Sequence, residues 1–172
     1  MKKLFSLLLL LTVAFSCIKK EEVKSVEKKG DPLVASVGEE SNGKYIFTDS
    51  DSLVYKWNVF VNKKMKPQDS IILNDFSIIK SKTKGERTED CYLLVAKDRD
   101  HKVSLGAILN VKDKKFYTKP EGASSQDIYE VILCNGGCND VICSPDVIVA
   151  GGVKRLICSA CDQCVKVSGS IK

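Results

Sequence analysis

The sequence predicts a mostly β protein, a small antiparallel sandwich or barrel that ends in a cysteine-rich hairpin. Three observations support this fold class. Apolar and polar residues alternate along several short segments, turn-forming residues separate these segments, and six of the eight cysteines lie in the last 39 residues. No long segment shows the 3.6-residue period of an amphipathic helix, so we expect strands throughout the chain.

A β domain is expected over residues 44–133. One of its segments is predicted to be a half-buried strand because every second residue is apolar: Leu53, Tyr55, Trp57, Val59 and Val61. By the same pattern we expect further strands over 71–79, 91–97, 103–111, 116–117 and 128–133. The intervening turns and loops are expected at 63–69, 82–88, 98–101, 113–114 and 120–126.

The hairpin module is expected over residues 134–172, packed on the β domain. Gly151 and Gly152 separate two β-rich runs and are typical of a two-residue hairpin turn. If Ala150 faces Val153, the register brings the cysteines on both sides of the turn to the open end of the hairpin. Pro145 limits strict pairing at that end, because it has no N–H to donate.

The six cysteines of this module are Cys134, Cys138, Cys143, Cys158, Cys161 and Cys164. The hairpin register places Cys143 between Cys158 and Cys161, and it places Cys138 beside Cys164. Cross-strand neighbours are close to disulfide reach, so we expect three disulfide bonds and leave their pairing open. These bonds would be structural, because the eight residues after Cys164 leave little room for the helix that activates a redox-active thiol.

Two kinds of metal site are alternatives to the disulfide bonds. The spacing Cys138-x4-Cys143-x14-Cys158-x2-Cys161 loosely follows the two-knuckle pattern of zinc ribbons. The spacing of Cys158, Cys161 and Cys164 suits a soft-metal or iron–sulfur site, but the further Cys-Pro of bacterial ferredoxins does not follow. Because the zinc pattern is followed only loosely and the ferredoxin pattern is incomplete, disulfides are favoured. We therefore expect neither a metal nor another cofactor.

Residues 1–16 have the pattern of a secretory signal peptide. Lys2 and Lys3 form a short basic start, an apolar run extends from Leu4 to Phe15, and the small residue Ser16 precedes Cys17. A membrane-spanning helix needs about 20 apolar residues, so this run is too short to span. Export to an oxidising compartment would favour disulfide bonds in the mature chain.

The segment Ala14-Phe15-Ser16-Cys17 resembles the lipobox of bacterial lipoproteins. In that family the cysteine is lipidated and becomes the new N-terminus, so the resemblance implies a membrane anchor at Cys17. Because Ile18 follows in place of the aspartate that retains such proteins in the inner membrane, the resemblance implies the outer membrane, on its periplasmic or surface face. An ordinary signal peptide is the alternative, because Ala14 and Ser16 also satisfy the small-x-small cleavage rule.

A charged tether is expected over residues 17–43, after the lipidated cysteine. Nine of the 14 residues from 18 to 31 are charged, a composition that cannot build a core. Without Lys2 and Lys3 the mature chain has 25 basic and 22 acidic residues, a net charge of +3. The basic residues are spread evenly, so we expect no nucleic-acid partner.

An odd number of cysteines remains if Cys17 carries lipid. Cys91 is then the expected free thiol, because it shares strand parity with Leu93 and Val95 and faces the core as a small apolar residue. The sequence contains one His and one Trp and offers no catalytic set, so we expect no enzyme. The predicted function is that of a lipid-anchored envelope protein with a binding or structural role, and the alternative is a thiolate protein that binds zinc or copper. The protein or small-molecule partner is left open.

Overall fold

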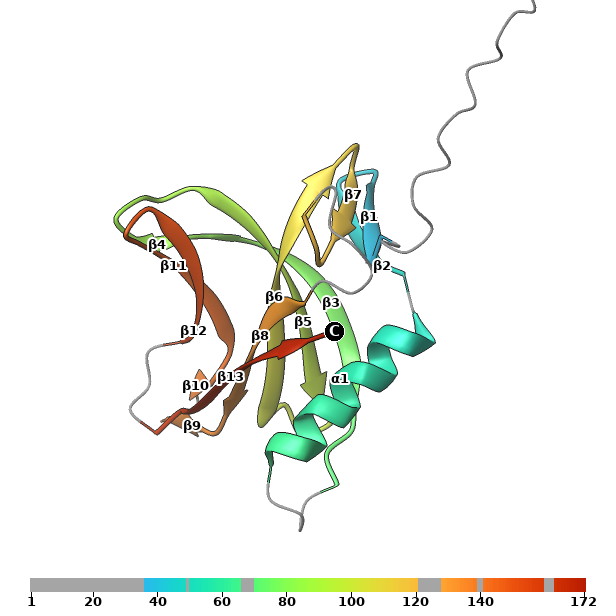
Figure 1. Ribbon diagram of the computed structural model, residues 1–172, viewed down its shortest axis with the longest axis vertical. Coiled ribbons are helices and arrows are strands. Elements are labelled where there is room, and N and C mark those ends of the chain that lie inside the picture. The colour runs from blue at the N-terminus through green and yellow to red at the C-terminus, as the bar shows by residue number, and fades with distance from the viewer. Residues whose placement is uncertain (1–35, 49, 66–69, 121–127, 139–140, 160–162) are drawn as a thin grey trace, which may run out of the picture. The chain divides into compact units, whose positions relative to one another are not determined.

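The domain is built around a large antiparallel sheet that carries a helix on one face and a small second sheet on the other (Figure 1). This computed structural model describes residues 36–172 except 49, 66–69, 121–127, 139–140 and 160–162. All of these residues belong to one compact unit, Asp31–Lys172. The predicted mostly β fold with a C-terminal cysteine-bearing hairpin is therefore confirmed.

The described elements follow one another along the chain as one helix among thirteen strands. Their bounds are β1 Gly38–Ser41, β2 Lys44–Phe47, α1 Asp51–Lys64, β3 Leu73–Lys82, β4 Lys84–Gly85, β5 Asp90–Asp98, β6 Val103–Lys112, β7 Lys115–Tyr117, β8 Tyr129–Asn135, β9 Gly137–Cys138, β10 Val141–Ile142, β11 Pro145–Ala150, β12 Val153–Cys158 and β13 Val165–Ile171.

Strand β6 is the centre of the large sheet. Along one edge it pairs with β5, which in turn pairs with β3. Along the other edge it pairs first with β8 and then with β7. The sheet continues from β8 to β13 and from β7 through β1 to β2. Every one of these pairs is antiparallel, both where a short turn joins the strands, as between β5 and β6, and where they are distant in sequence, as β8 and β13 are.

The main core lies between this sheet and α1. The sheet curves so that β2 approaches β3, where the ring of Phe47 stacks on that of Phe76 at a centroid distance of 5.2 Å. Trp57 from the helix lies 5.7 Å from the same Phe76 ring and is fully buried. Leu94 and Leu105, on neighbouring strands, are also fully buried in this cluster. Aromatic and branched aliphatic side chains thus fill the space under the helix.

The strand predicted from Leu53 to Val61 is wrong, because these residues belong to α1. The side chain of Ser50 caps the helix by accepting a hydrogen bond from the Leu53 N–H (3.4 Å), and Asp51 adds a negative charge to the first turn. The buried residues are Leu53, Trp57, Phe60 and Val61, a 3.6-residue spacing. Two of the alternating apolar residues that suggested a strand, Tyr55 and Val59, are exposed. The apolar residues at every second position are therefore not all on the buried side.

Two asparagines of α1 hold the beginning of β3. Asn58 accepts a hydrogen bond from the Leu73 N–H (2.7 Å) and donates to the Leu73 carbonyl (3.3 Å). Asn62 makes the same pair of bonds with Ile71, at 3.0 and 2.7 Å. The side-chain amides therefore take the place of a neighbouring strand and satisfy the backbone of Ile71, which precedes β3, and of Leu73, its first residue.

The hairpin layer covers the other face of the large sheet. Strands β11 and β12 pair in the predicted register, from Ala150 opposite Val153 to Pro145 opposite Cys158, and β4 adds a short parallel pair to β11. Pro145 packs on Gly106 of β6, where an added Cβ would lie 2.3 Å from the proline Cβ. The hairpin therefore lies directly against the backbone of the central sheet.

The predicted domain boundaries differ from the elements that the structure contains. The expected tether extended to residue 43, but Gly38–Ser41 form β1; most of the tether, like the signal peptide, lies outside the described residues. The boundary expected between residues 133 and 134 falls inside β8. Strand β13 pairs with β8, so Val165 lies opposite Asn135 and not opposite Cys138, where the extrapolated hairpin register placed it.

Candidate functional site

Four cysteines of the C-terminal module, Cys134, Cys143, Cys158 and the partly buried Cys164, form one sulfur cluster between the two sheets. Cys134 is bonded to Cys158 and Cys143 is bonded to Cys164, with Cα atoms 5.7 and 5.8 Å apart. Cys134, Cys143 and Cys158 are at most 1% exposed. The first bond joins β8 of the large sheet to β12, and the second joins the segment before β11 to the segment before β13. Both bonds therefore fix the hairpin layer to the rest of the domain.

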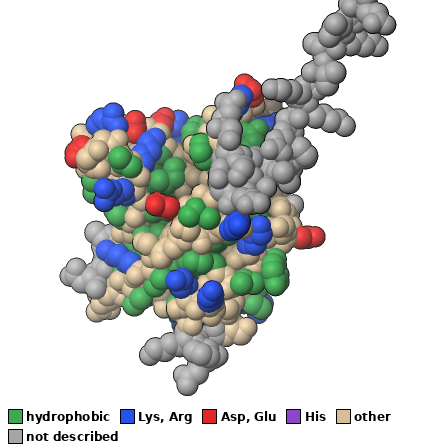
Figure 2. All heavy atoms as spheres, viewed as in Figure 1, with side chains coloured by type: hydrophobic (Ala, Val, Ile, Leu, Met, Phe, Trp, Pro, Cys, Tyr) green, Lys and Arg blue, Asp and Glu red, His purple; other side chains and the backbone are tan. Residues whose placement is uncertain are grey.

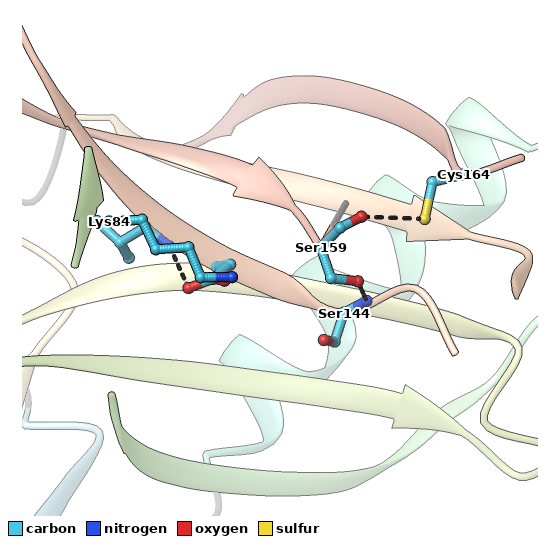
Figure 3. Close-up of polar contacts among 6 residues, drawn as sticks. Lys84, Ser144, Ser159 and Cys164 are labelled. Carbon is cyan, nitrogen blue, oxygen red and sulfur yellow. Dashed lines mark hydrogen bonds and ion pairs between the residues drawn. The ribbon is translucent and has the colours of Figure 1, made fainter. Parts of the chain in front are cut away.

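Polar contacts complete the open end of the hairpin (Figure 3). The Ser159 hydroxyl accepts a hydrogen bond from the Ser144 N–H (3.0 Å), and the Ser159 N–H donates to the Ser144 carbonyl (2.7 Å). The Ser159 carbonyl lies 3.6 Å from the Sγ of Cys164, a packing contact because a disulfide sulfur has no proton to donate. Ser104 of β6 donates to the Cys143 carbonyl (2.9 Å). The backbone around the disulfides is thus satisfied.

Three of the predicted site cysteines are not placed by the structure. Cys17 and Cys161 lie outside the described residues, and of Cys138 the backbone in β9 is described. We expected Cys138 beside Cys164 because we extended the β11–β12 register to these residues. That extension is wrong, because the strand after Cys164 pairs with β8 and Cys164 is bonded to Cys143. The connection between β12 and β13 allows this, since it carries the chain from the hairpin layer back to the large sheet.

Cys91 is the cysteine without a disulfide partner among the described residues. It is 3% exposed and lies on the face of β5 that carries Leu93 and Val95, where all three pack against Val147 of β11. Burial raises the pKa of its thiol above the ordinary value, so the thiol is the stable form. In this position Cys91 packs as a small apolar side chain.

The tip of the hairpin is held by the loop between β3 and β5. The Glu86 carboxylate accepts hydrogen bonds from the N–H groups of Gly151 (2.8 Å) and Gly152 (3.1 Å), and these bonds lower its pKa. Buried Thr83 shapes the loop by donating to the Arg87 carbonyl (2.7 Å). The hairpin is therefore held at both ends, by sulfur at the open end and by a carboxylate at the turn.

Two ion pairs also join the hairpin layer to this loop. Lys84 contacts Asp146 at 2.5 Å across the β4–β11 pair (Figure 3). Lys154 of β12 contacts Glu89 at 3.3 Å. Exposed pairs of this kind contribute little individually, so they support the register of the layer more than its stability.

A shallow depression opens at the end of β3 and β5. It has a volume of about 590 Å³ and is lined by Lys80, Ser81, Lys82 and Asp90. Lys80 and Asp90 form an ion pair of 2.6 Å, which raises the pKa of the lysine and lowers that of the aspartate. The lining is polar and open to water, unlike the enclosed apolar pockets that hold most small molecules.

The hairpin contacts at Glu86 and this depression were missed by sequence reasoning. Glu86 lies in a predicted loop, and its partners Gly151 and Gly152 are 65 and 66 residues away, so no local pattern connects them. The two N–H groups of a Gly-Gly turn need hydrogen-bond acceptors, but the turn sequence does not indicate which residue supplies them.

Comparison with known protein families, curated proteins and solved structures found no match for this chain. In the part of the chain that the structure describes, no group of three or more His, Cys, Asp or Glu side chains is arranged to hold a metal ion. Among the same residues, no helix combines the length and hydropathy needed to cross a bilayer.

Proposed function

We propose that this protein is a lipid-anchored lipoprotein of the bacterial cell envelope with a non-catalytic binding or structural role. The two disulfide bonds between the sheets carry this proposal. Disulfides form and persist in oxidising compartments outside the cytoplasm, and residues 1–16 have the pattern of an export signal. The bonds and the signal are independent features that agree on one compartment.

Cys17 is the proposed anchor, in the outer membrane. Three acyl chains would hold the mature protein there, since each buried methylene contributes about 0.8 kcal/mol and a single chain binds only marginally. The β domain would then stand on its charged segment, on the periplasmic or the surface face. Its function would be to bind a partner or to serve a structural role through its surface, without catalysis.

Zinc or copper binding by the terminal thiolates is the alternative function. It is favoured by one observation: four sulfurs gather in one cluster between the sheets. In the disulfide state these sulfurs offer no thiolate, so metal binding would need a reduced protein. Stoichiometric zinc or copper together with free thiols in the purified protein would favour this function over the structural one.

Labelling and mass measurement test the proposal together. Cells that express the chain are fed labelled palmitate, and the intact mass of the mature protein is measured with and without reduction and thiol alkylation. We expect label in the wild type, none in Cys17→Ser, and full label in the control Cys91→Ser. A mature wild-type protein that starts at Cys17 without acyl mass would overturn the anchor.

A further inference from the structure

The outer face of α1 has a composition suited to a charged lipid surface. Tyr55, Val59 and Lys63 follow one another at four-residue intervals, and Lys56 lies beside them one turn from Val59. Tyr55 is 70% exposed and Val59 is 46% exposed, and both lysines are exposed. These four residues, the α1 outer face, form one contiguous exposed strip, in which Tyr55 and Val59 lie opposite the buried residues and the two lysines lie on the flank nearer Phe60.

The charge of this strip is not neutralised. In the described part of the chain neither Lys56 nor Lys63 forms an ion pair, and the acidic residue of the helix, Asp51, lies in the first turn. Figure 2 shows hydrophobic and basic side chains together on the part of the surface where Figure 1 places α1. Tyrosine and lysine both have an apolar body and a polar end, which suits them to the boundary between lipid and water.

The chain enters the domain beside this helix. The Thr48 N–H donates to the Val37 carbonyl (2.9 Å), so the first described residues lie next to the segment that leads into the Ser50 cap of α1. The predicted tether between Cys17 and Val37 has a reach of roughly 25 Å if it behaves as a flexible chain. The 14 residues of α1 extend about 21 Å, so the whole helix would lie within reach of the membrane.

We infer that the α1 outer face rests on an anionic lipid headgroup layer and orients the domain on the membrane. This inference rests on the proposed lipid anchor, which brings the helix to the surface. The acyl chains would supply the attachment, and the lysines with Tyr55 would select the side of the domain that faces the lipid.

The test uses a chain that cannot be acylated. The mature sequence from residue 17 onward, with Cys17→Ser and exported from an ordinary signal peptide, is mixed with vesicles of phosphatidylglycerol and phosphatidylethanolamine, or of phosphatidylcholine alone. We expect binding to the anionic vesicles at low salt, little to the neutral vesicles, and loss of binding as salt shortens the electrostatic range. Each lysine contributes about fivefold to such binding, so Lys56→Gln with Lys63→Gln should weaken it about 25-fold.

The matched control neutralises two basic residues of the opposite layer. Lys154→Gln with Arg155→Gln changes the net charge equally, but β12 lies on the other face of the large sheet. We expect this pair to change vesicle affinity less than twofold. Thermal unfolding of all variants checks that the fold is retained.

Two results would overturn the inference. One is the absence of anionic-vesicle binding by the unacylated chain at low salt, and the other is an equal loss in the α1 and β12 pairs. Because palmitate labelling is measured separately on the wild type, a labelled wild type together with an unacylated chain that fails to bind anionic vesicles would refute the oriented face and leave the anchor standing. An unlabelled protein would refute the anchor instead.

Discussion

Glu86 holds the hairpin turn through bonds that need its negative charge. Two N–H groups donate to its carboxylate, so protonation removes the stronger acceptor and weakens the contact between the β3–β5 loop and the turn at Gly151–Gly152. The pKa of Glu86 is lowered in the folded protein from its ordinary value of 4.5. Stability from this contact is therefore complete above that value and is lost as the pH falls through the lowered folded pKa.

We predict that Glu86→Gln lowers the melting temperature at pH 7 and that the difference from the wild type shrinks below pH 4. The neutral amide accepts a weaker hydrogen bond, and at low pH the wild-type side chain is also neutral. Thermal unfolding followed by circular dichroism from pH 3 to 7 measures the difference. Asp90 has a lowered pKa for a separate reason, its contact with Lys80, and its contribution is common to both proteins. A difference that stays constant with pH would contradict the role of the charge.

The Cys91 thiol is expected to react slowly because of its surroundings. Burial raises the pKa of its thiol, and the packing of Val147 on the same face leaves little access. We predict that a soluble alkylating reagent modifies Cys91 only slowly in the native non-reduced protein and rapidly in denaturant. Peptide mapping after a time course measures both rates, with Cys91→Ala as the control for other labelled sites. Rapid native labelling would show that the hairpin layer opens readily.

At the scale of elements, helix α1 was the main failure of sequence-based prediction. Its apolar residues fit a period of two as well as one of 3.6, and alternation at Leu53, Tyr55 and Trp57 suggested a strand. The deciding signals were Ser50 before the helix, Phe60 between two expected strand positions, and lysines in the last turn. The Asn58 bonds to residue 73 could not be predicted, because they depend on a tertiary contact.

We predict that Asn58→Ala destabilises the protein by about 1–2 kcal/mol, because two backbone groups of Leu73 lose their partners. Asn62→Ala should cost somewhat less because its side chain is more exposed. Urea unfolding measures both changes, with Asn110→Ala, an exposed residue of β6, as the control. Since alanine favours a helix more than asparagine does, a neutral or stabilising result at Asn58 would contradict the pairing described here.

The β11–β12 hairpin, unlike helix α1, was predicted correctly from the sequence. Its full register follows from one local feature, Gly151–Gly152, because a two-residue turn determines every pair before it. Sequence patterns also placed β3, β5, β6 and β8 closely, since each carries apolar residues at every second position. What remained unknown was which sheet each strand joins, a matter of long-range pairing that periodicity does not encode.

At the scale of the whole molecule, the two disulfides add covalent links between layers that also pack on each other through Val147 and Pro145. The bonds close segments with sequence separations of 24 and 21 residues, for which the chain-entropy account gives about 3 kcal/mol each. These covalent links are of the kind expected in the oxidising compartment that residues 1–16 predict.

We predict that Cys134→Ala with Cys158→Ala lowers the free energy of unfolding by about 3 kcal/mol or more, because the link between β8 and β12 is lost. Reductant should have a larger effect on the wild type, because it breaks the Cys143–Cys164 bond as well. Urea unfolding with and without dithiothreitol measures it, and trypsin cleavage after Lys154 and Arg155 on β12 should become faster. A Cys91→Ala protein serves as the control. An unchanged midpoint in the double variant would mean that the noncovalent contacts alone hold the hairpin layer.

The position of β13 determines when the domain can finish folding. Helix α1 lies near the beginning of the domain, yet Phe60 packs against Gly169 of β13, and Ile171 completes the same core. A chain that emerges from its N-terminal end, from a ribosome or a translocation channel, must therefore keep this side of Phe60 uncovered until β13 has followed. For that whole interval the emerging chain offers an apolar helix face to chaperones, and a stall anywhere before β13 leaves an aggregation-prone intermediate in place of a smaller stable domain.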